Sequence, residues 1–290
     1  MIHLKARGRG TKYSAARGLV ESLLQMLYAG EWPAALWKFW PGAADACLVT
    51  HTIHAPRNTP ACRLAFASDL HIGPTTPQAV LNRAAKLIRE AEPDVLLLGG
   101  DYLFLDATQS KLDRLCSWLS ATGATKIIAV VGNHDLWGDE THIIRTLQGA
   151  GVQILINAGV RLPAPFEYIA IVGLDEPMTG VVDAAAAFAG SESAAVRIVL
   201  CHEPDGLLSC EGRDFDLFLC GHTHGGQIAT RTRAIVVPPG ELHRAFHAGF
   251  FIYRDRQVFV SRGIGGAEIP VRINAQPDVL IVDIEASAQG

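Results

Sequence analysis

Side chains of the kinds that bind metal ions recur at five places in this chain, each directly after a short apolar run. The runs are typical of buried strands, so the polar residues after them would lie in loops at the carboxyl ends of those strands. That edge of an α/β sheet is where such folds usually place their sites. The candidate metal ligands are Asp69, His71, Asp101, Asn133, His202, His222 and His224.

The mixture of residue types indicates which metals would bind. Carboxylate, amide oxygen and imidazole together suit borderline divalent ions such as Mn, Fe, Zn or Co. Asp69 and His71 are two residues apart, so a strand end would direct both side chains the same way, and His222 and His224 repeat this spacing. Taken alone, any one of these histidines is better explained as a hydrogen-bonded structural residue. All five blocks in this order favour a metal site.

Other titratable residues fall outside these blocks. Glu203 follows His202 directly, and it either supports the ligands or has a structural role. The remaining histidines belong to no motif and are predicted to be surface or structural residues, namely His51, His54, His142, His243 and His247.

The ordered blocks are similar to a known family. Asp69-x-His71, Gly100-Asp101, Gly132-Asn133-His134-Asp135, His202 and Gly221-His222-Thr223-His224 resemble the calcineurin-like metallophosphoesterase superfamily, over roughly residues 60–290. The longer blocks Gly221–Ile228 and Val260–Gly265 resemble the YkuE/YaeI-type branch of small bacterial phosphoesterases. That branch commonly carries a membrane-associated N-terminus.

The resemblance implies a role for each matched residue. Two divalent metal ions would bind, the first to Asp69, His71 and His224, the second to Asn133, His202 and His222, with Asp101 bridging them. Such ions lie about 3.5–4 Å apart and share a hydroxide that attacks phosphorus in line. His134 would act on the leaving oxygen as an acid or hydrogen-bond donor, and Asp135 would orient the His134 ring. Arg244, Arg262 and Arg272 are candidate phosphate clamps, while the glycines of residues 263–266 would either contact a phosphate or form a tight turn.

One departure from the family bears on the substrate. Protein phosphatases of the superfamily place an arginine soon after the Gly-Asp block, whereas here Gly100-Asp101 is followed by Tyr102-Leu103-Phe104. This argues against a phosphoprotein and favours a phosphodiester or pyrophosphate bond in a substrate with an apolar part. A lipid-linked substrate of the UDP-diacylglucosamine type and a soluble phosphodiester are the two alternatives.

The alternative to an enzyme is a protein of the same fold without catalytic activity. A metal-free scaffold of the same fold, acting as a protein-binding module, should have lost ligands, whereas every expected position is retained here. Another class of metallohydrolase should show a His-x-His signature near its start, but the chain has this pattern only at His222 and His224.

The elements that must position these residues form a layered α/β pattern. Apolar runs at residues 64–67, 95–98, 127–131, 168–172, 197–200 and 217–219 predict buried strands, with helices over residues 77–90 and 111–119 between the first of them. Residues 50–53 suggest an edge strand, residues 250–260 a hairpin and residues 279–284 a further strand. The fold class is therefore α/β in the form of an α+β sandwich. Two packed mixed sheets flanked by helices are expected, in the four-layer architecture of the metallophosphoesterases.

The first 44 residues differ in character from the phosphoesterase domain expected over residues 45–290. They are basic at the start, and Leu19, Leu23 and Met26 belong to one broad apolar arc of a predicted helix. A second short helix would begin at Pro33, with Trp32, Leu36, Phe39 and Trp40 sharing one side. This composition is typical of a segment in a membrane interface, and packing on the protein's own core or on a second subunit are the alternatives.

Composition sets the remaining expectations. The 290-residue chain is 49% hydrophobic with a net charge of -4, so nucleic acid is not an expected partner. The expected partner, which the family resemblance implies, is a phosphate-ester substrate. The six cysteines show no paired spacing and read as free thiols. No apolar stretch reaches the roughly 18–20 residues that span a bilayer. We therefore expect a cytoplasmic protein, or one attached peripherally to the inner face of a membrane.

Overall fold

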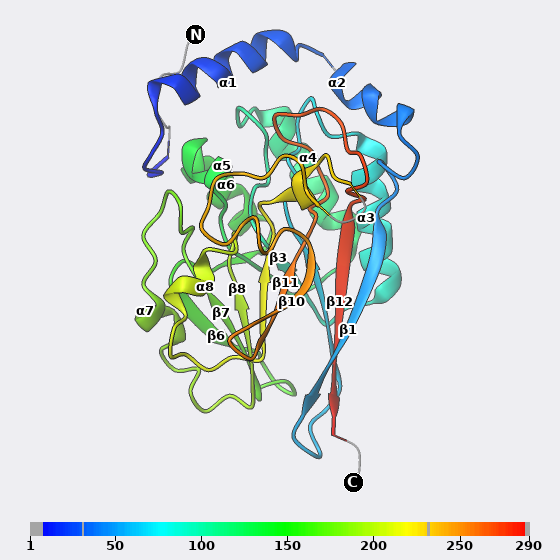
Figure 1. Cartoon of the computed structure of the whole chain (residues 1–290). Coiled ribbons are helices and arrows are strands. Elements are labelled where there is room, and N and C mark those ends of the chain that lie inside the picture. Colours follow the sequence, from blue (N-terminus) through cyan, green and yellow to red (C-terminus); the bar gives the residue numbers. More distant parts are fainter. Residues whose placement is uncertain (1–7, 31, 231–232, 288–290) are drawn as a thin grey trace.

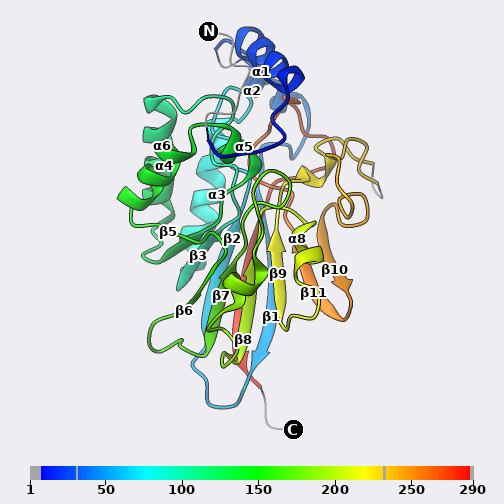
Figure 2. The ribbon, with the colours of Figure 1, turned by 90° about the vertical axis from the view of Figure 1, so that its left-hand side faces the viewer.

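The computed structural model describes residues 8–30, 32–230 and 233–287. The apolar runs form two six-stranded sheets that lie face to face (Figures 1 and 2). The first has the order β1-β12-β2-β3-β4-β5, with strands β1 (Cys47–Ala55), β2 (Cys62–Ala67), β3 (Val95–Leu98), β4 (Ile127–Ala129), β5 (Gln153–Ile154) and β12 (Asp278–Ala286). The second has the order β10-β11-β9-β8-β7-β6, with strands β6 (Ala158–Arg161), β7 (Ile169–Gly173), β8 (Val196–Leu200), β9 (Leu217–Cys220), β10 (Gly249–Tyr253) and β11 (Arg256–Val260).

Both sheets are mixed, and the strands that carry ligands are parallel to one another. Strands β2 to β5 run parallel, and β12 pairs antiparallel with β2. In the second sheet β7, β8, β9 and β11 are parallel, with β6 and β10 antiparallel at the two edges. The carboxyl ends of the central strands therefore meet at one end of the molecule.

The alternation of side chains along each strand builds the layers. In β2, Leu64 and Phe66 lie in the apolar core between the sheets, while Ala65 and Ala67 face the helices on the other side. The first sheet is covered by α3 (Gln78–Ala91), α4 (Gln109–Thr122) and α6 (Glu140–Gly149), and the second by the shorter α7 (Ala184–Phe188) and α8 (Gly206–Ser209). Strands buried on both faces read as unbroken apolar runs, which is why the sequence revealed them.

The predicted fold class, two packed mixed sheets flanked by helices in four layers, is confirmed. Strand β1 lies at the edge of the first sheet, as expected, and β10 and β11 form the expected hairpin. The expected strand over 127–131 ends at Ala129. Strands β5 and β6 had no apolar run to reveal them. All six cysteines are free, as predicted.

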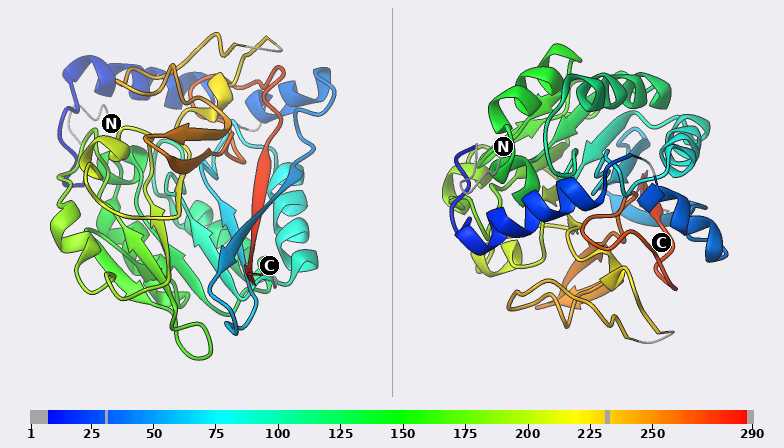
Figure 3. Two further views of the ribbon diagram at one scale, coloured as in Figure 1. Left: turned by 60° about the horizontal axis from the view of Figure 1, so that its bottom comes forward. Right: turned by 90° about the horizontal axis from the view of Figure 1, so that it is seen from above.

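The N-terminal helices lie across the end of the sheets where the ligand-bearing strands finish (Figures 1 and 3). These are α1 (Ala15–Leu27), α2 (Trp32–Ala35) and the 3-10 turn η1 (Leu36–Phe39). The small residues Gly18 and Ser22 face the protein, whereas Leu19, Leu23 and Met26 are exposed. The helix therefore packs on the protein through its small residues and through Leu24, which lies against the buried Phe104 cluster, whereas most of its apolar arc is left exposed.

The second N-terminal segment divides its aromatic residues between core and solvent. Trp37, which the predicted apolar side omitted, is buried in the same core as α3, whereas Trp32 and Phe39 are exposed. Division of the chain into residues 1–44 and 45–290 stays a prediction. None of the helices in the described parts of the chain is long and apolar enough to cross a membrane.

Candidate metal centre

The seven predicted ligands come together at the carboxyl ends of strands from both sheets. The N-terminal helices lie over this end of the sheets (Figure 1). Three follow strands of the first sheet, since Asp69 comes after β2, Asp101 after β3 and Asn133 after β4. His202 and His222 follow β8 and β9 of the second sheet. All seven side chains are buried, so the centre is enclosed by protein on most sides.

The first group of ligands is formed by Asp69, His71 and His224. The Nε2 atoms of His71 and His224 lie 3.1 Å apart, and His224 Nε2 is 3.4 Å from Asp69 Oδ1. Asp101 Oδ2 lies 3.4 Å from His71 Nε2. These ring nitrogens and carboxylate oxygens therefore point at one small space.

The second group is formed by Asn133, His202 and His222. Asn133 Oδ1 lies 3.1 Å from His202 Nε2 and 3.0 Å from His222 Nδ1, and these two nitrogens are 3.1 Å apart. Asp101 Oδ2, which lies near His71 in the first group, is also 3.3 Å from His202 Nε2. One carboxylate oxygen is thus shared between the groups, as a bridging ligand requires.

The spacing of these atoms, and the protonation of two of the rings, fit metal binding. Ligand atoms bonded at about 2.0–2.2 Å to one ion, at angles of about 90–110°, lie about 2.8–3.6 Å apart, which covers the shared contacts above. Burial lowers the pKa of His71 and of His222 to about 3, so both rings are neutral at neutral pH and keep a lone pair for an ion. His202 Nδ1 lies 2.7 Å from the carbonyl oxygen of Gly99, which fixes a ring tautomer with Nε2 free to bind.

The backbone is strained at the ligands themselves. Five of them have left-handed φ angles, which ordinary residues adopt at a cost of about 1–3 kcal/mol each. They are Asp69 (55°), His71 (40°), Asp101 (57°), His222 (67°) and His224 (53°). Concentrated strain of this kind indicates a site that the surrounding fold holds in place.

Two glycines are required because ligand carboxylates occupy the space where a Cβ would lie. A Cβ at Gly132 would overlap the Asp101 carboxylate, and one at Gly221 would overlap the Asp69 carboxylate. The loop of residues 263–266 serves the same centre, since the N–H of Gly265 donates to the carbonyl of Asp69. Of the two predicted roles for this loop, the contacts favour a turn that supports Asp69.

Asp135 makes contacts that the sequence did not predict. Its carboxylate accepts hydrogen bonds from the backbone N–H groups of Asp101, Tyr102 and Gly132, and it thereby holds the loops that carry Asp101 and Asn133. The prediction that Asp135 orients the His134 ring stays a prediction beside these three backbone contacts. The carboxylate beside that ring is Glu268, whose Oε1 lies 3.7 Å from His134 Nε2.

Glu203 and His243 lie on the far side of His222 from the ligand group. Glu203 Oε2 is 3.5 Å from His222 Nε2 and 3.2 Å from His243 Nε2, and all three side chains are buried. Glu203 can therefore accept from His222 Nε2–H and leave Nδ1 free for a metal. His243, predicted to be surface or structural, is fully buried beside the ligands, and no motif in the sequence revealed this.

The candidate arginine clamps do not line the cavity at the centre. Arg272 is buried, donates to the carbonyls of Gly265 and Ala275, and lies 3.2 Å from His224 Nδ1. Arg262 pairs with Asp278 at 2.9 Å, and Arg244 is exposed. Arg272 and Arg262 therefore support the fold around the centre, because their side chains are already bound to other protein groups.

A cavity of about 440 Å³ opens beside the ligands. Asp101, Asn133, His222 and His224 lie in its wall together with His134 and Arg17. Much of the remaining wall is apolar, formed by Met178, Val236, Val237, Pro238, Pro239 and Ile269. Arg17 was visible in the sequence only as one of several basic N-terminal residues, and nothing in its neighbours showed that α1 turns it toward the site.

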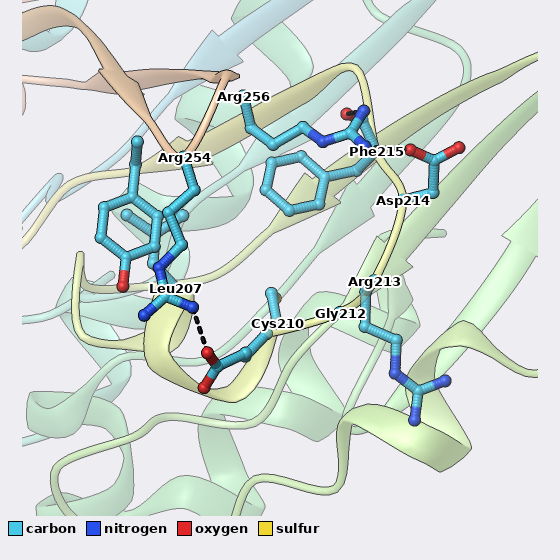
Figure 4. A pocket seen from close by; sticks show the side chains of 10 residues that line it. Leu207, Cys210, Gly212, Arg213, Asp214, Phe215, Arg254 and Arg256 are labelled. Atoms are coloured by element: carbon cyan, nitrogen blue, oxygen red, sulfur yellow. Dashed lines mark hydrogen bonds and ion pairs between the residues drawn. The ribbon is translucent and has the colours of Figure 1, made fainter.

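A second cavity, of about 370 Å³, lies between α8 and the turn joining β10 to β11 (Figure 4). Three arginines line it, but their charges are largely compensated. Arg254 pairs with Glu211, Arg256 pairs with Asp214, and Arg213 lies over the Phe188 ring. Two of the three arginines are therefore paired with carboxylates, and no candidate metal ligand lies in this cavity wall.

Comparison with known proteins agrees with the geometry. The sequence model of the calcineurin-like phosphoesterase superfamily domain matches residues 62–253. Phosphodiesterase YaeI of Escherichia coli (strain K12) is 31% identical over 227 residues, covering 77% of this chain and 82% of that protein. The uncharacterized metallophosphoesterase YkuE of Bacillus subtilis (strain 168) is 26% identical over 244 residues, covering 82% of this chain and 85% of that protein.

Proposed function

The chain belongs to the calcineurin-like phosphoesterase superfamily, and on this basis we propose that it hydrolyses a phosphodiester or pyrophosphate bond with the help of two divalent metal ions. The observation that carries the proposal is the shared position of Asp101 Oδ2, within 3.4 Å of His71 in one ligand group and 3.3 Å of His202 in the other. Mononuclear binding would not need a carboxylate placed between two sets of ligands.

The residues would divide the chemistry between them. Asp69, His71 and His224 would hold one ion and Asn133, His202 and His222 the other. When bound, such ions supply an activated hydroxide and neutralise charge on the phosphoryl oxygens. His134 lines the cavity beside Asp101 and would donate to the leaving oxygen. Asp135 would keep the two ligand loops at a fixed separation.

The apolar wall of the cavity supports a substrate with an apolar part. Arg17 is the one arginine in the cavity wall, and two carboxylates already contact it. No phosphate-gripping arginine of the protein-phosphatase kind therefore lines the described cavity. The relative named phosphodiesterase YaeI favours a diester over a monoester.

Of the two substrate classes, the exposed apolar surface of the N-terminal helices favours the lipid-linked one over a soluble phosphodiester. The apolar outer surface of the N-terminal helices, formed by Leu19, Val20, Leu23, Met26, Leu27, Trp32 and Phe39, faces away from the protein. Ile235 and Val236 are also exposed, and Val236 lies in the cavity wall together with Arg17 of α1. Contact of this surface with a bilayer would bring the cavity mouth to the lipid headgroups. Exposed Lys12 and Lys38 would favour anionic lipid.

The first test is hydrolysis of bis-p-nitrophenyl phosphate and p-nitrophenyl phosphate by metal-stripped protein with Mn, Zn, Fe(II), Co or Mg restored. Asp101→Asn should abolish the activity, and His134→Ala should lower it, only modestly for p-nitrophenyl esters because p-nitrophenolate needs little protonation. His142→Ala, a change at an exposed histidine of α6, should leave it intact. Absence of activity with every ion, together with no bound metal by elemental analysis, would contradict the proposal and favour the metal-free scaffold.

The substrate class needs a separate comparison. A UDP-diacylglucosamine-type pyrophosphate and a short-chain soluble diester should be offered to the same metal-loaded protein. We expect a higher kcat/KM for the lipid-linked compound, with the difference reduced by polar substitutions on the apolar outer surface. Equal values for both compounds would instead support a soluble diester.

A further inference from the structure

We propose that Arg17 of α1 and Glu268 form a positioning pair that holds the His134 ring at the cavity, so that the N-terminal helix takes part in the reaction site. The inference rests on the proposed function, because it concerns the residue that would act on the leaving oxygen. It assigns a role to a segment that lies outside the matched family domain of residues 62–253.

The contacts run from the helix to the ring in two steps. Arg17 Nη1 donates to Glu268 Oε1 at 2.6 Å, and the same oxygen lies 3.7 Å from His134 Nε2. Among the described residues, no other carboxylate forms an ion pair with the His134 ring. All three side chains line the same cavity.

Glu268 is held by α1 at two points. Besides the contact with Arg17 near the start of the helix, the hydroxyl of Tyr28 at its end donates to the backbone carbonyl of Glu268 at 2.7 Å. Burial raises the pKa of Glu268, but attraction to His134 and Arg17 outweighs this and gives a pKa of about 2. The group is therefore a carboxylate at any working pH, able to accept from the ring.

Arg17 is itself locked in place. Glu21, one turn further along α1, accepts from its Nε at 2.9 Å, and the guanidinium stacks over the Trp137 ring at 4.9 Å. Trp137 also packs edgewise on His134, with ring centroids 5.8 Å apart. A planar guanidinium can stack and donate sideways at once, which a lysine ammonium cannot do.

The same contacts argue against Arg17 as a direct phosphate clamp. Its charge is shared between two carboxylates, which lowers its attraction for a phosphate, and only its Nη2 is left without a partner. A role through Glu268 and His134 uses the contacts that Arg17 already makes.

The segment before α1 is anchored to the protein as well, in part through Trp137 of the cavity wall. Arg9 pairs with Glu140 at 2.8 Å and with Asp175 at 2.6 Å, and Trp137 Nε1 donates to the carbonyl of Thr11. Removal of residues 1–44 would therefore change the reaction site as well as any membrane contact. Lipid binding must be tested by point substitutions in the full chain.

The test compares two leaving groups. Bis-p-nitrophenyl phosphate releases a weak base that needs little protonation, whereas diphenyl phosphate releases a stronger base that depends on an acid. Glu268→Gln and Arg17→Gln should lower kcat for diphenyl phosphate about 10–100-fold, part of the 10²–10⁴-fold that acid catalysis contributes. For bis-p-nitrophenyl phosphate, kcat should fall less than about threefold, and KM and metal content should be unchanged. Arg17→Lys should fall between, because it keeps the charge and loses the stacking.

Two controls separate positioning from a merely structural effect. Arg83→Gln removes an arginine that pairs with Asp45 at 3.5 Å on the surface, and it should leave both activities unchanged. Glu268→Gln combined with His134→Ala should cost no more than His134→Ala alone, because the first residue acts through the second.

The results that would overturn the inference are distinct from those that would overturn the proposed function. Equal losses on both esters, additive losses in the double variant, or a rise in KM without a change in kcat would overturn the inference alone. A metal-loaded wild type that hydrolyses neither ester would overturn the proposed function, and the inference with it.

Discussion

Replacing the apolar outer surface of α1 with polar residues should detach the protein from membranes. Leu19, Leu23 and Met26 are 60%, 61% and 78% exposed, and none of them is in the cavity wall. The variant Leu19→Gln/Leu23→Gln/Met26→Gln keeps good helix formers at all three positions. It therefore tests surface chemistry without weakening the helix.

The size of the effect follows from the exposed fractions. Full burial of a Leu or Met side chain contributes about 1.5–3 kcal/mol, so each of these side chains would gain about 1–2 kcal/mol in lipid. Because an interfacial helix inserts only partly, we take the lower end, about 3 kcal/mol for the three together. This corresponds to about a 100-fold weaker partition coefficient.

Sedimentation with vesicles of phosphatidylethanolamine and phosphatidylglycerol measures this directly in the full-length protein. The matched control is Val181→Thr/Ile252→Thr, which changes side chains that are 72% and 65% exposed on other parts of the molecule. The reasoning is refuted if wild type does not sediment with the vesicles, or if the triple variant and the control bind equally well. Concentration-dependent dimerisation of the wild type that the triple variant lacks would identify a second subunit as the occupant.

Three further predictions concern the metal centre. Gly221→Ala should abolish binding of the first ion by elemental analysis while the protein remains folded by circular dichroism, because the new Cβ would overlap the Asp69 carboxylate; normal metal content would contradict this. Glu203→Gln should weaken binding of the second ion about 10–100-fold in a chelator competition, since it replaces the carboxylate charge beside His222 Nε2 with a neutral amide, and an unchanged affinity would exclude that role. Burial raises the pKa of Asp69 to about 6, so the metal-free protein should lose stability as the pH rises from about 4 to 6, while Mn affinity, which needs the carboxylate, rises over the same range. Calorimetric Mn titration and thermal unfolding of the metal-free protein, both from about pH 4 to 6.5, check the last prediction, and a flat affinity would contradict it.

The ligand set could be predicted because each member follows a strand whose apolar run is unmistakable. Asp69, Asp101 and His202 each stand two or three residues beyond such a run, and parallel strands bring their carboxyl ends to one edge. Resemblance to the family then supplied the division into two groups, and the observed contacts around Asp101 agree with that division.

The supporting residues could not be predicted in the same way. Glu268 lies 134 residues from His134 along the chain, and Arg17 lies further still from Glu268, with no shared motif. His243 reads as an ordinary histidine in an irregular loop. Their roles depend on which loops and helices pack together, and local periodicity carries no information about that.

Even the helical pattern of α1 left its orientation open. The apolar arc identified an amphipathic helix, but not which face would meet the protein. Tertiary contacts decided this, because Gly18 and Ser22 allow close packing, and Arg17 and Tyr28 find partners at Glu268. The sequence by itself determined the layered fold and the candidate metal ligands, since buried strands and their carboxyl-end loops are local patterns. The tertiary structure alone placed α1 over the reaction site, because that placement depends on pairing between groups far apart in the chain.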